Sequence, residues 1–243
     1  MGKSKDLATR VGIDDNADAT AITIDSSERV GIGTTTPDYA LTVEGTSHPR
    51  IRVNATDNTA SGLFMHVSNS GSQTGSATLR IDGSGNYSVY NGTSSSPLTM
   101  NIDGSGRVTM PSQPAFGVYK TATTASGSDV THNSSWANVG SHYSSSTGKF
   151  TCPVAGTYYF YCTGLTQPSG GVSRMSIRVN GSIKSSESRN ENISGDYLHI
   201  VTSGVMTLSA NDYVTMYYAN DDGSTVLYSD SSPYITFGGY LIG

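Results

Sequence analysis

The chain has 243 residues, of which 35% are hydrophobic and 14% charged, and its formal net charge at pH 7 is −5. An acidic chain lacks the basic surface that nucleic acid selects, and no apolar run approaches the roughly 20 residues of a membrane-spanning helix. We therefore expect no nucleic-acid partner and no membrane insertion. The 28 glycines, 15 tyrosines and small net charge favour folded, turn-rich β-structure over disorder. The low apolar fraction favours burial between chains.

One short turn pattern occurs three times, as IDSSERV (24–30), IDGSGNY (81–87) and IDGSGRV (102–108). In each copy an apolar residue precedes an Asp, small or polar residues follow, and an apolar residue ends the turn. An Asp side chain can cap such a turn, and glycine adopts positive φ without penalty. Alternating apolar residues flank each copy, so the pattern predicts three β-hairpins. A lone hairpin is marginal in water, and three chains around an axis would bury one face of each.

Residues Thr20–Gly45, TAITIDSSERVGIGTTTPDYALTVEG, resemble the N-terminal or shaft segments of bacteriophage tail fibres, especially marine ones. The run VGIGTTTP, Val30–Pro37, is its most specific part, and Glu28 and Arg29 stand where related fibres often have Gly-Asn. The resemblance implies a virion-attachment segment over residues 1–45, which contacts other tail or adaptor proteins, followed by a β-rich shaft over 46–112. The N-terminus, MGKSKDLATR, has no hydrophobic core of a secretory signal, so we expect assembly in the host cytoplasm.

PSQPAF, Pro111–Phe116, predicts a short extended hinge, because each proline restricts its neighbour. Beyond it, GKFTCPVAGTYYFYC, Gly148–Cys162, predicts an antiparallel hairpin, with alternating residues facing a core on both sides of the turn near Gly156. Cys152 and Cys162 would not lie opposite each other in such a hairpin, so buried free thiols are favoured over a disulfide. A zinc site lacks further ligands nearby.

From Phe116 to the end the chain resembles the complement one-q globular head family, which shares its jelly roll with the tumour-necrosis-factor family. Its motifs occur in order: FGVYK, the Trp136 loop, GKFTCPVAGTYYF, the strand and turn RVNG, LSANDYVTMYY and ITFGGYLIG. In LSANDYVTMYY, Asn211 replaces the usual glycine of a turn before a strand. The resemblance implies a ten-stranded jelly-roll head over residues 113–243, assembled as a homotrimer and used for recognition. No Gly-X-Y period is present, so the stalk is not collagen. The predicted fold is all-β, with a hairpin-rich trimeric shaft before the head.

An enzyme is not expected, because the sequence contains none of the common hydrolase, metalloprotease, phosphate-loop or dinucleotide motifs. His132, His142 and His199 lie in polar contexts and are expected at the surface. No cofactor is predicted. Asp221 and Asp222, in the turn YANDDGS, are candidate calcium ligands near a three-fold axis, and a solvated Asx turn without an ion is the favoured alternative.

Recognition is expected from exposed aromatics and from two loops predicted at Gly164–Ser173 and Ser185–Asp196. Tyr217 and Tyr218 are consecutive, so one of the two is expected in the core. The candidate receptor-binding residues are Trp136, Gln167, Ser169, Arg189, Asn190 and Asn192.

The two resemblances together predict a virion fibre that adheres to a host-surface glycan or protein through a trimeric head. One alternative is a capsid- or tail-decorating fibre that binds no receptor. Another is a secreted lectin-like recognition protein.

Overall fold

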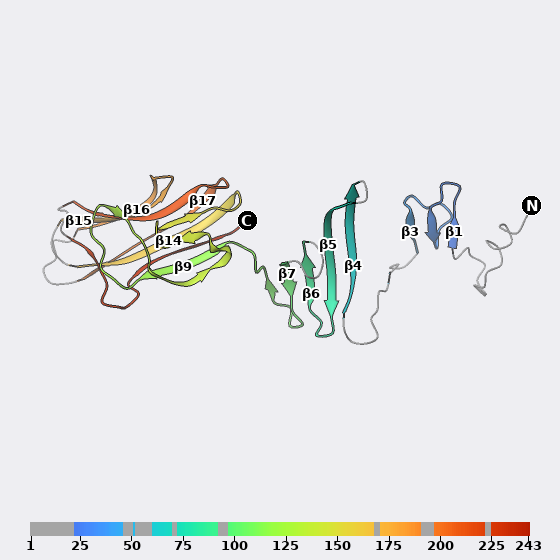
Figure 1. The fold of residues 1–243 in the computed structure, drawn as a ribbon, viewed down its shortest axis with the longest axis horizontal. Coiled ribbons are helices and arrows are strands. Elements are labelled where there is room, and N and C mark those ends of the chain that lie inside the picture. Colours follow the sequence, from blue (N-terminus) through green and yellow to red (C-terminus); the bar gives the residue numbers. More distant parts are fainter. Residues whose placement is uncertain are drawn as a thin grey trace, which may run out of the picture. The chain divides into compact units, whose positions relative to one another are not determined.

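The computed structural model describes residues 22–45, 51, 60–69, 72–91, 97–167, 171–190, 197–221 and 225–243, and the side chains of 60–76 and 189–190 lie outside that description. The chain divides into two compact units, residues 1–63 and 64–243. In the described residues all regular structure is β except one three-residue 3-10 turn, Val139–Ser141 (Figure 1), which confirms the all-β prediction. None of the described segments forms a helix long and apolar enough to cross a membrane.

The first unit contains a three-stranded sheet in the order β1-β2-β3. Strands β1 (Ile22–Ile24) and β2 (Val30–Ile32) form the first predicted hairpin. Strand β3 (Leu41–Val43) returns parallel to β2 after a crossover through residues 33–40.

A five-stranded sheet in the order β4-β5-β6-β7-β8 follows along the chain (Figure 1), and all of it except the first four residues of β4 belongs to the second unit. Its strands are Ala60–Asn69, Ser72–Asp82, Tyr87–Tyr90, Leu98–Ile102 and Val108–Thr109. The other two copies of the turn pattern join β5 to β6 and β7 to β8, both antiparallel pairs, so all three predicted hairpins are confirmed.

The three turns share one hydrogen-bond scheme, because in each the Asp carboxylate binds the chain that follows it. One carboxylate oxygen accepts the main-chain N–H groups two and four residues later, and the other accepts a side-chain N–H from the fourth residue. These side-chain bonds are Arg29 Nε to Asp25 (2.8 Å), Asn86 Nδ2 to Asp82 (2.9 Å) and Arg107 Nε to Asp103 (2.6 Å). The predicted Asp capping is thus confirmed, and Arg29 and Arg107 make the same side-chain bond as Asn86.

The segment predicted as an extended hinge is a turn held against the last strand of the head. The N–H of Gln113 donates to the carbonyl of Met110 (3.0 Å), which closes the turn. The side-chain amide of Gln113 donates to the carbonyl of Leu241 (2.6 Å), and the N–H of Leu241 donates to Pro114 (3.0 Å). The hinge prediction is therefore wrong, because polar bonds to a distant strand fix this segment.

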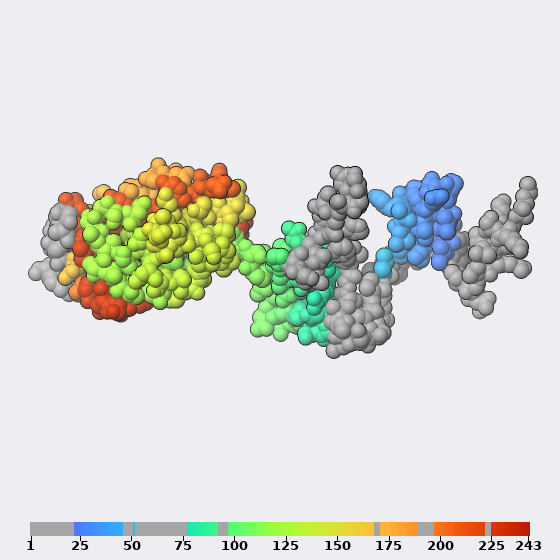
Figure 2. Space-filling view, viewed as in Figure 1, coloured from blue at the N-terminus to red at the C-terminus, as the bar shows by residue number. Residues whose placement is uncertain are grey.

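The head is a β-sandwich of ten strands with two short side strands (Figure 1). Figure 2 shows the surface of the head from the same side, coloured from green through yellow to red. The first sheet has the order β11-β9-β20-β14-β17, with β19 beside β14. Its strands are Ser134–Asn138, Ala115–Lys120, Ile235–Leu241, Gly156–Thr166, Leu198–Leu208 and Leu227–Tyr228. The second sheet has the order β12-β13-β18-β15-β16, with β10 beside β18. Its strands are Tyr143–Ser144, Lys149–Thr151, Tyr213–Asn220, Val172–Val179, Ser182–Asn190 and Ser128–Asp129.

Two tight turns predicted from the sequence appear in this sandwich. Asn180 and Gly181 both have positive φ (50° and 81°), which matches the two-residue hairpin between β15 and β16. Asn211 has φ 71° in the turn before β18, where it stands in place of glycine.

Aromatic rings from both sheets fill the core. Phe116 of β9 stacks on Phe150 of β13 with centroids 4.6 Å apart, and meets Phe237 of β20 edge-on at 4.9 Å. Such geometries add to the stabilisation that comes from burial. The head therefore holds its own apolar core.

Strands β13 and β14 do not pair with each other, so the predicted Gly148–Cys162 hairpin is wrong. β13 pairs with β12 and β18 in the second sheet, whereas β14 pairs with β17 and β20 in the first. The expected alternation of buried and outward-facing residues still holds in both strands. The chain passes from one sheet to the other between them, and both sheets face the same core. Cys152 and Cys162 are buried free thiols, as predicted, and burial raises the pKa of both, that of Cys152 to about 11.

Candidate functional site

The outer side of the first sheet carries a group of aromatic side chains. Along β14, Tyr158 and Phe160 point into the core, so Tyr159 and Tyr161 point outward. Tyr159 lies directly across from Tyr240 of β20, with ring centroids 5.6 Å apart. We use the name aromatic face for the set Tyr119, Trp136, Tyr159, Tyr161 and Tyr240.

Glycines on the neighbouring strands make room for these rings. A Cβ at Gly238 would lie 2.6 Å from the ring of Tyr161, and one at Gly117 would meet Trp136 at 3.6 Å. Gly238 pairs with both Tyr161 and Gly117, so the ring of Tyr161 covers backbone that has no side chain of its own. This close approach explains why the first glycine of the closing motif FGGYLIG, Gly238, has no side chain.

The aromatic face continues into exposed aliphatic residues on β17. Val201 and Val205 occupy outward positions, and Val205 is 63% exposed. At the β11 edge, Trp136 stacks on Tyr119 with centroids 4.7 Å apart. Contiguous exposed apolar surface of this kind marks a contact site in soluble proteins.

The outer side of the second sheet is polar and charged instead. The guanidinium of Arg178 lies 3.2 Å from the ring centroid of Tyr217, and Lys149 lies 4.0 Å from that of Tyr213. Asp129 on β10 accepts a hydrogen bond from the Thr215 hydroxyl (3.2 Å) and lies 3.8 Å from Arg178. Tyr218 is fully buried beside the half-buried Tyr217, which confirms that one of the pair lies in the core.

The predicted receptor-binding residues lie on different elements. Trp136 is on β11 and Gln167 follows β14, where its N–H donates to the carbonyl of Val226 (3.1 Å). Arg189 and Asn190 end strand β16, so the part of the predicted Ser185–Asp196 loop up to residue 190 is strand. That expectation was wrong because pairing with β15 extends a polar segment that has no apolar alternation of its own. Ser169 and Asn192 lie outside the described residues.

Of the two candidate calcium ligands, only Asp221 is described. Its carboxylate accepts the N–H of Val172 at 2.6 Å, which ties the start of β15 to the end of β18. Asp222 lies outside the described residues. Among the residues that the structure describes, no three His, Cys, Asp or Glu side chains gather as metal ligands would.

His132 is buried in the head, so its predicted surface position is wrong. Its Nδ1 lies 2.8 Å from the Tyr143 hydroxyl, and its ring is 5.9 Å from that of Phe237. Burial, with a smaller effect of the Lys120 charge, lowers the pKa of His132 to about 3, so the ring is neutral at physiological pH. The packing of the two sheets buries this residue, and its polar sequence neighbours give no sign of it.

The aromatic face includes three half-buried tyrosines that were not predicted from the sequence, Tyr119, Tyr159 and Tyr161. The signal was present in GTYYFYC, because tyrosines alternate there with the residues assigned to the core. The partner strands and their glycines, which complete the face, are far apart in the sequence.

Comparison with known proteins identifies the head. A solved structure titled as the globular domain of zebrafish complement 1qA is 24% identical, with 54% of this chain and 98% of that one covered and a TM-score of 0.40. The sequence model of the C1q domain matches residues 115–242, from the first strand of the head to its C-terminal end. That span is more than half of the chain, and the chain therefore belongs to the C1q domain family.

Proposed function

We propose that this protein is a virion fibre that adheres to a host-cell surface through a trimeric C1q head. One observation carries the proposal: the C1q domain follows Asp-capped β-hairpins and not a collagen repeat. The resemblance of residues 20–45 to bacteriophage tail fibres supports the same conclusion. The N-terminal segment would attach to tail or adaptor proteins, and the chain would assemble in the host cytoplasm without catalytic activity.

The aromatic face is the surface on which three heads would associate. C1q domains typically form trimers, and this face combines the exposed Tyr240, Trp136 and half-buried tyrosines with the exposed valines of β17. Interface cores are enriched in aromatic residues and depleted in charge, as this face is. Tyr159 and Tyr240 would lie near its centre.

Host binding would use surface that remains outside this contact. The outer side of the second sheet offers Arg178 stacked on Tyr217, together with Lys149 and Tyr213. Gln167 and the ends of neighbouring strands would contribute from the loops. Three equivalent weak sites on one fibre raise avidity through effective concentration.

Binding of the labelled full-length protein to a panel of bacterial cells and bacterial surface polysaccharides tests this proposal. Trimeric protein, with a mass near 76 kDa (three times 25.4 kDa), should bind at least one strain saturably. Gln167→Ala and Arg178→Ala should weaken binding and keep the trimeric mass. Trp136→Ala separates two roles, because weaker binding at unchanged mass indicates receptor contact, whereas a fall in mass indicates subunit contact. A trimer that binds no strain would favour the decorating fibre without a receptor.

No cofactor is part of this proposal. Calcium at Asp221 and Asp222 is the one alternative, and melting curves with calcium and with a chelator test it. An unchanged melting midpoint would contradict calcium binding and leave Asp221 with one role, to accept the hydrogen bond from the N–H of Val172.

A further inference from the structure

All six apolar residues of the small N-terminal sheet lie on one of its faces. The register pairs Ile22 with Ile32 and Ile32 with Val43, which makes one row across the three strands. A second row has the same form and consists of Ile24, Val30 and Leu41. Cross-strand partners share a face and their neighbours along a strand point the other way, so these six side chains are the aliphatic face.

The opposite face is covered by the chain itself. The middle row across the strands is Thr23, Gly31 and Thr42, and the crossover after β2 folds back over it. A Cβ at Gly31 would lie 2.5 Å from the carbonyl oxygen of Thr34, so only glycine fits there. Thr34 and Pro37 are buried in this position. The run VGIGTTTP therefore encodes a loop that covers one face of its own sheet.

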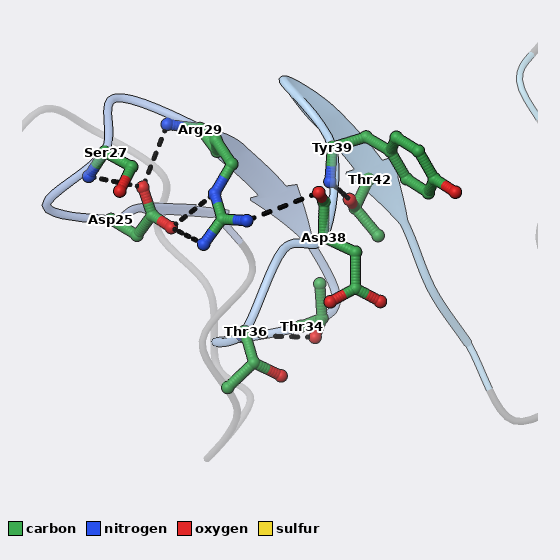
Figure 3. Close-up of polar contacts among 8 residues, drawn as sticks. All are labelled: Asp25, Ser27, Arg29, Thr34, Thr36, Asp38, Tyr39 and Thr42. Atoms are coloured by element: carbon green, nitrogen blue, oxygen red, sulfur yellow. Dashed lines mark hydrogen bonds and ion pairs between the residues drawn. The ribbon is translucent and has the colours of Figure 1, made fainter.

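Polar bonds, and not an apolar core, fix the shape of this unit (Figure 3). Arg29 forms an ion pair with Asp25 at 2.7 Å and donates to the carbonyl of Asp38 at 3.3 Å, which joins the hairpin turn to the crossover. The N–H of Tyr39 donates to the Thr42 hydroxyl (3.2 Å) and holds the crossover to β3. These bonds present the aliphatic face without covering it.

Most of the aliphatic face is open to solvent in the single chain. Ile24 is 69% exposed and Leu41 is 54% exposed, and Ile22 and Ile32 are also exposed. A segment this short cannot bury enough surface alone, because domains below about 40 residues generally need disulfides, metals or oligomerisation. The described residues 22–45 include no cysteine, and no group of metal ligands occurs among the described residues.

We propose that residues 22–45 form a second trimerisation element, in which three copies pack their aliphatic faces together around a three-fold axis. The occupant of each face is the same sheet of two further copies, because the face carries no charge or polar group that would recognise a different partner. The inference rests on the proposed homotrimer, since the heads of a trimer keep the other two copies at high local concentration. Closed symmetric contacts are the usual outcome for identical chains.

Site-directed cross-linking in the full-length protein tests this packing. Ile24→Cys places a thiol on the aliphatic face, and Thr35→Cys places one on the exposed crossover as the matched control. The natural Cys152 and Cys162 are buried. With copper-phenanthroline as oxidant, Ile24→Cys should form a disulfide between two of the three chains, seen as a band near 51 kDa (twice 25.4 kDa). Thr35→Cys should form little of it. No band from Ile24→Cys, or equal bands from both variants, would overturn the proposal.

Hydrogen exchange gives a second readout that does not need a new covalent bond. Ile24→Asp should remove amide protection across residues 22–45, while Thr35→Asp keeps it and both variants retain the trimeric mass set by the heads. Unchanged protection in Ile24→Asp would also overturn the proposal, because a residue this exposed in the single chain tolerates a charge unless another copy covers it. Cell binding by the head is measured separately, so failure of adhesion leaves these two results unaffected.

Discussion

The head and the N-terminal sheet use the same alternation of apolar and polar residues, with opposite results. Among the described residues of the head, twenty buried apolar residues between Phe116 and Phe237 form one core. In the N-terminal sheet the corresponding aliphatic residues are mostly exposed. The difference is the second layer: the head supplies two sheets that cover each other, whereas residues 22–45 supply one sheet and a loop on its polar side. Alternation thus specifies a face, and the rest of the chain determines what covers it.

Truncation of the core should show the largest effect and confine it to the head. Phe160→Ala removes a fully buried ring that contacts Tyr158 and Phe150, and should destabilise the head by about 3–5 kcal/mol. Urea unfolding followed by near-ultraviolet circular dichroism measures this. Ile183→Ala, at an exposed position on β16 outside the aromatic face, is the control. A loss below about 1 kcal/mol for Phe160→Ala would contradict a self-contained core.

Acid should weaken the head through His132. Its pKa is about 3 in the fold and 6.5 without it, so folding favours the neutral ring. The neutral ring therefore contributes fully to the free energy of unfolding above pH 6.5. This contribution is lost as the pH falls towards 3, and the total loss is about a few kcal/mol. The melting midpoint of His132→Phe should therefore depend less on pH between 6.5 and 4 than that of the wild type. His199 is exposed, so the melting midpoint of His199→Gln should depend on pH as that of the wild type does. Identical pH dependence in all three proteins would show that His132 does not titrate on unfolding.

The N-terminal hairpin should respond to acid at lower pH. The main-chain N–H of Arg29, its side chain and the N–H of Ser27 hold the pKa of Asp25 below 3.8. Folding thus favours the carboxylate, and its contribution is present above pH 3.8 and lost as the pH falls below that value. Protection factors of the amides in residues 22–45, which are corrected for the intrinsic pH dependence of exchange, should fall only in this range, and Asp25→Asn should remove this fall. Loss of protection already at pH 6 would contradict this assignment.

The smallest effect is expected at the positive-φ position that the three hairpin turns share. Glu28 has φ 61° where the other turns have Gly85 and Gly106 at 78° and 80°. Glu28→Gly should relieve strain and stabilise the first turn by up to about 1 kcal/mol. The matched substitution Gly106→Ala should destabilise its turn by about 1 kcal/mol or more. Hydrogen exchange at each turn measures the change in local stability for both variants. Changes of the same sign would show that the positive φ does not determine which residue is favoured at this position.

Much of the local structure follows from particular residues in the sequence. The three Asp turns, the Asn180-Gly181 hairpin and the alternation in Tyr158–Cys162 occur as predicted, because each depends on neighbours within a few residues. The jelly-roll head was predicted from motifs in order. The predictions that were wrong concern contacts between distant segments. Strands β13 and β14 belong to different sheets, the Gln113 side chain donates to the carbonyl of Leu241, and His132 is buried against the aromatic core.

The sequence by itself therefore determined the turns, the side of each strand that is apolar, and the family of the head. These properties depend on backbone dihedrals, on the two-residue period of a strand and on the order of local motifs. Only the tertiary structure decided which apolar faces are covered and which stay open. The aromatic face joins β9, β11, β14 and β20, and the aliphatic face is open because the VGIGTTTP loop covers the other side of its sheet. Coverage depends on strand order and close packing between segments far apart in the chain, and local residue patterns do not contain that information.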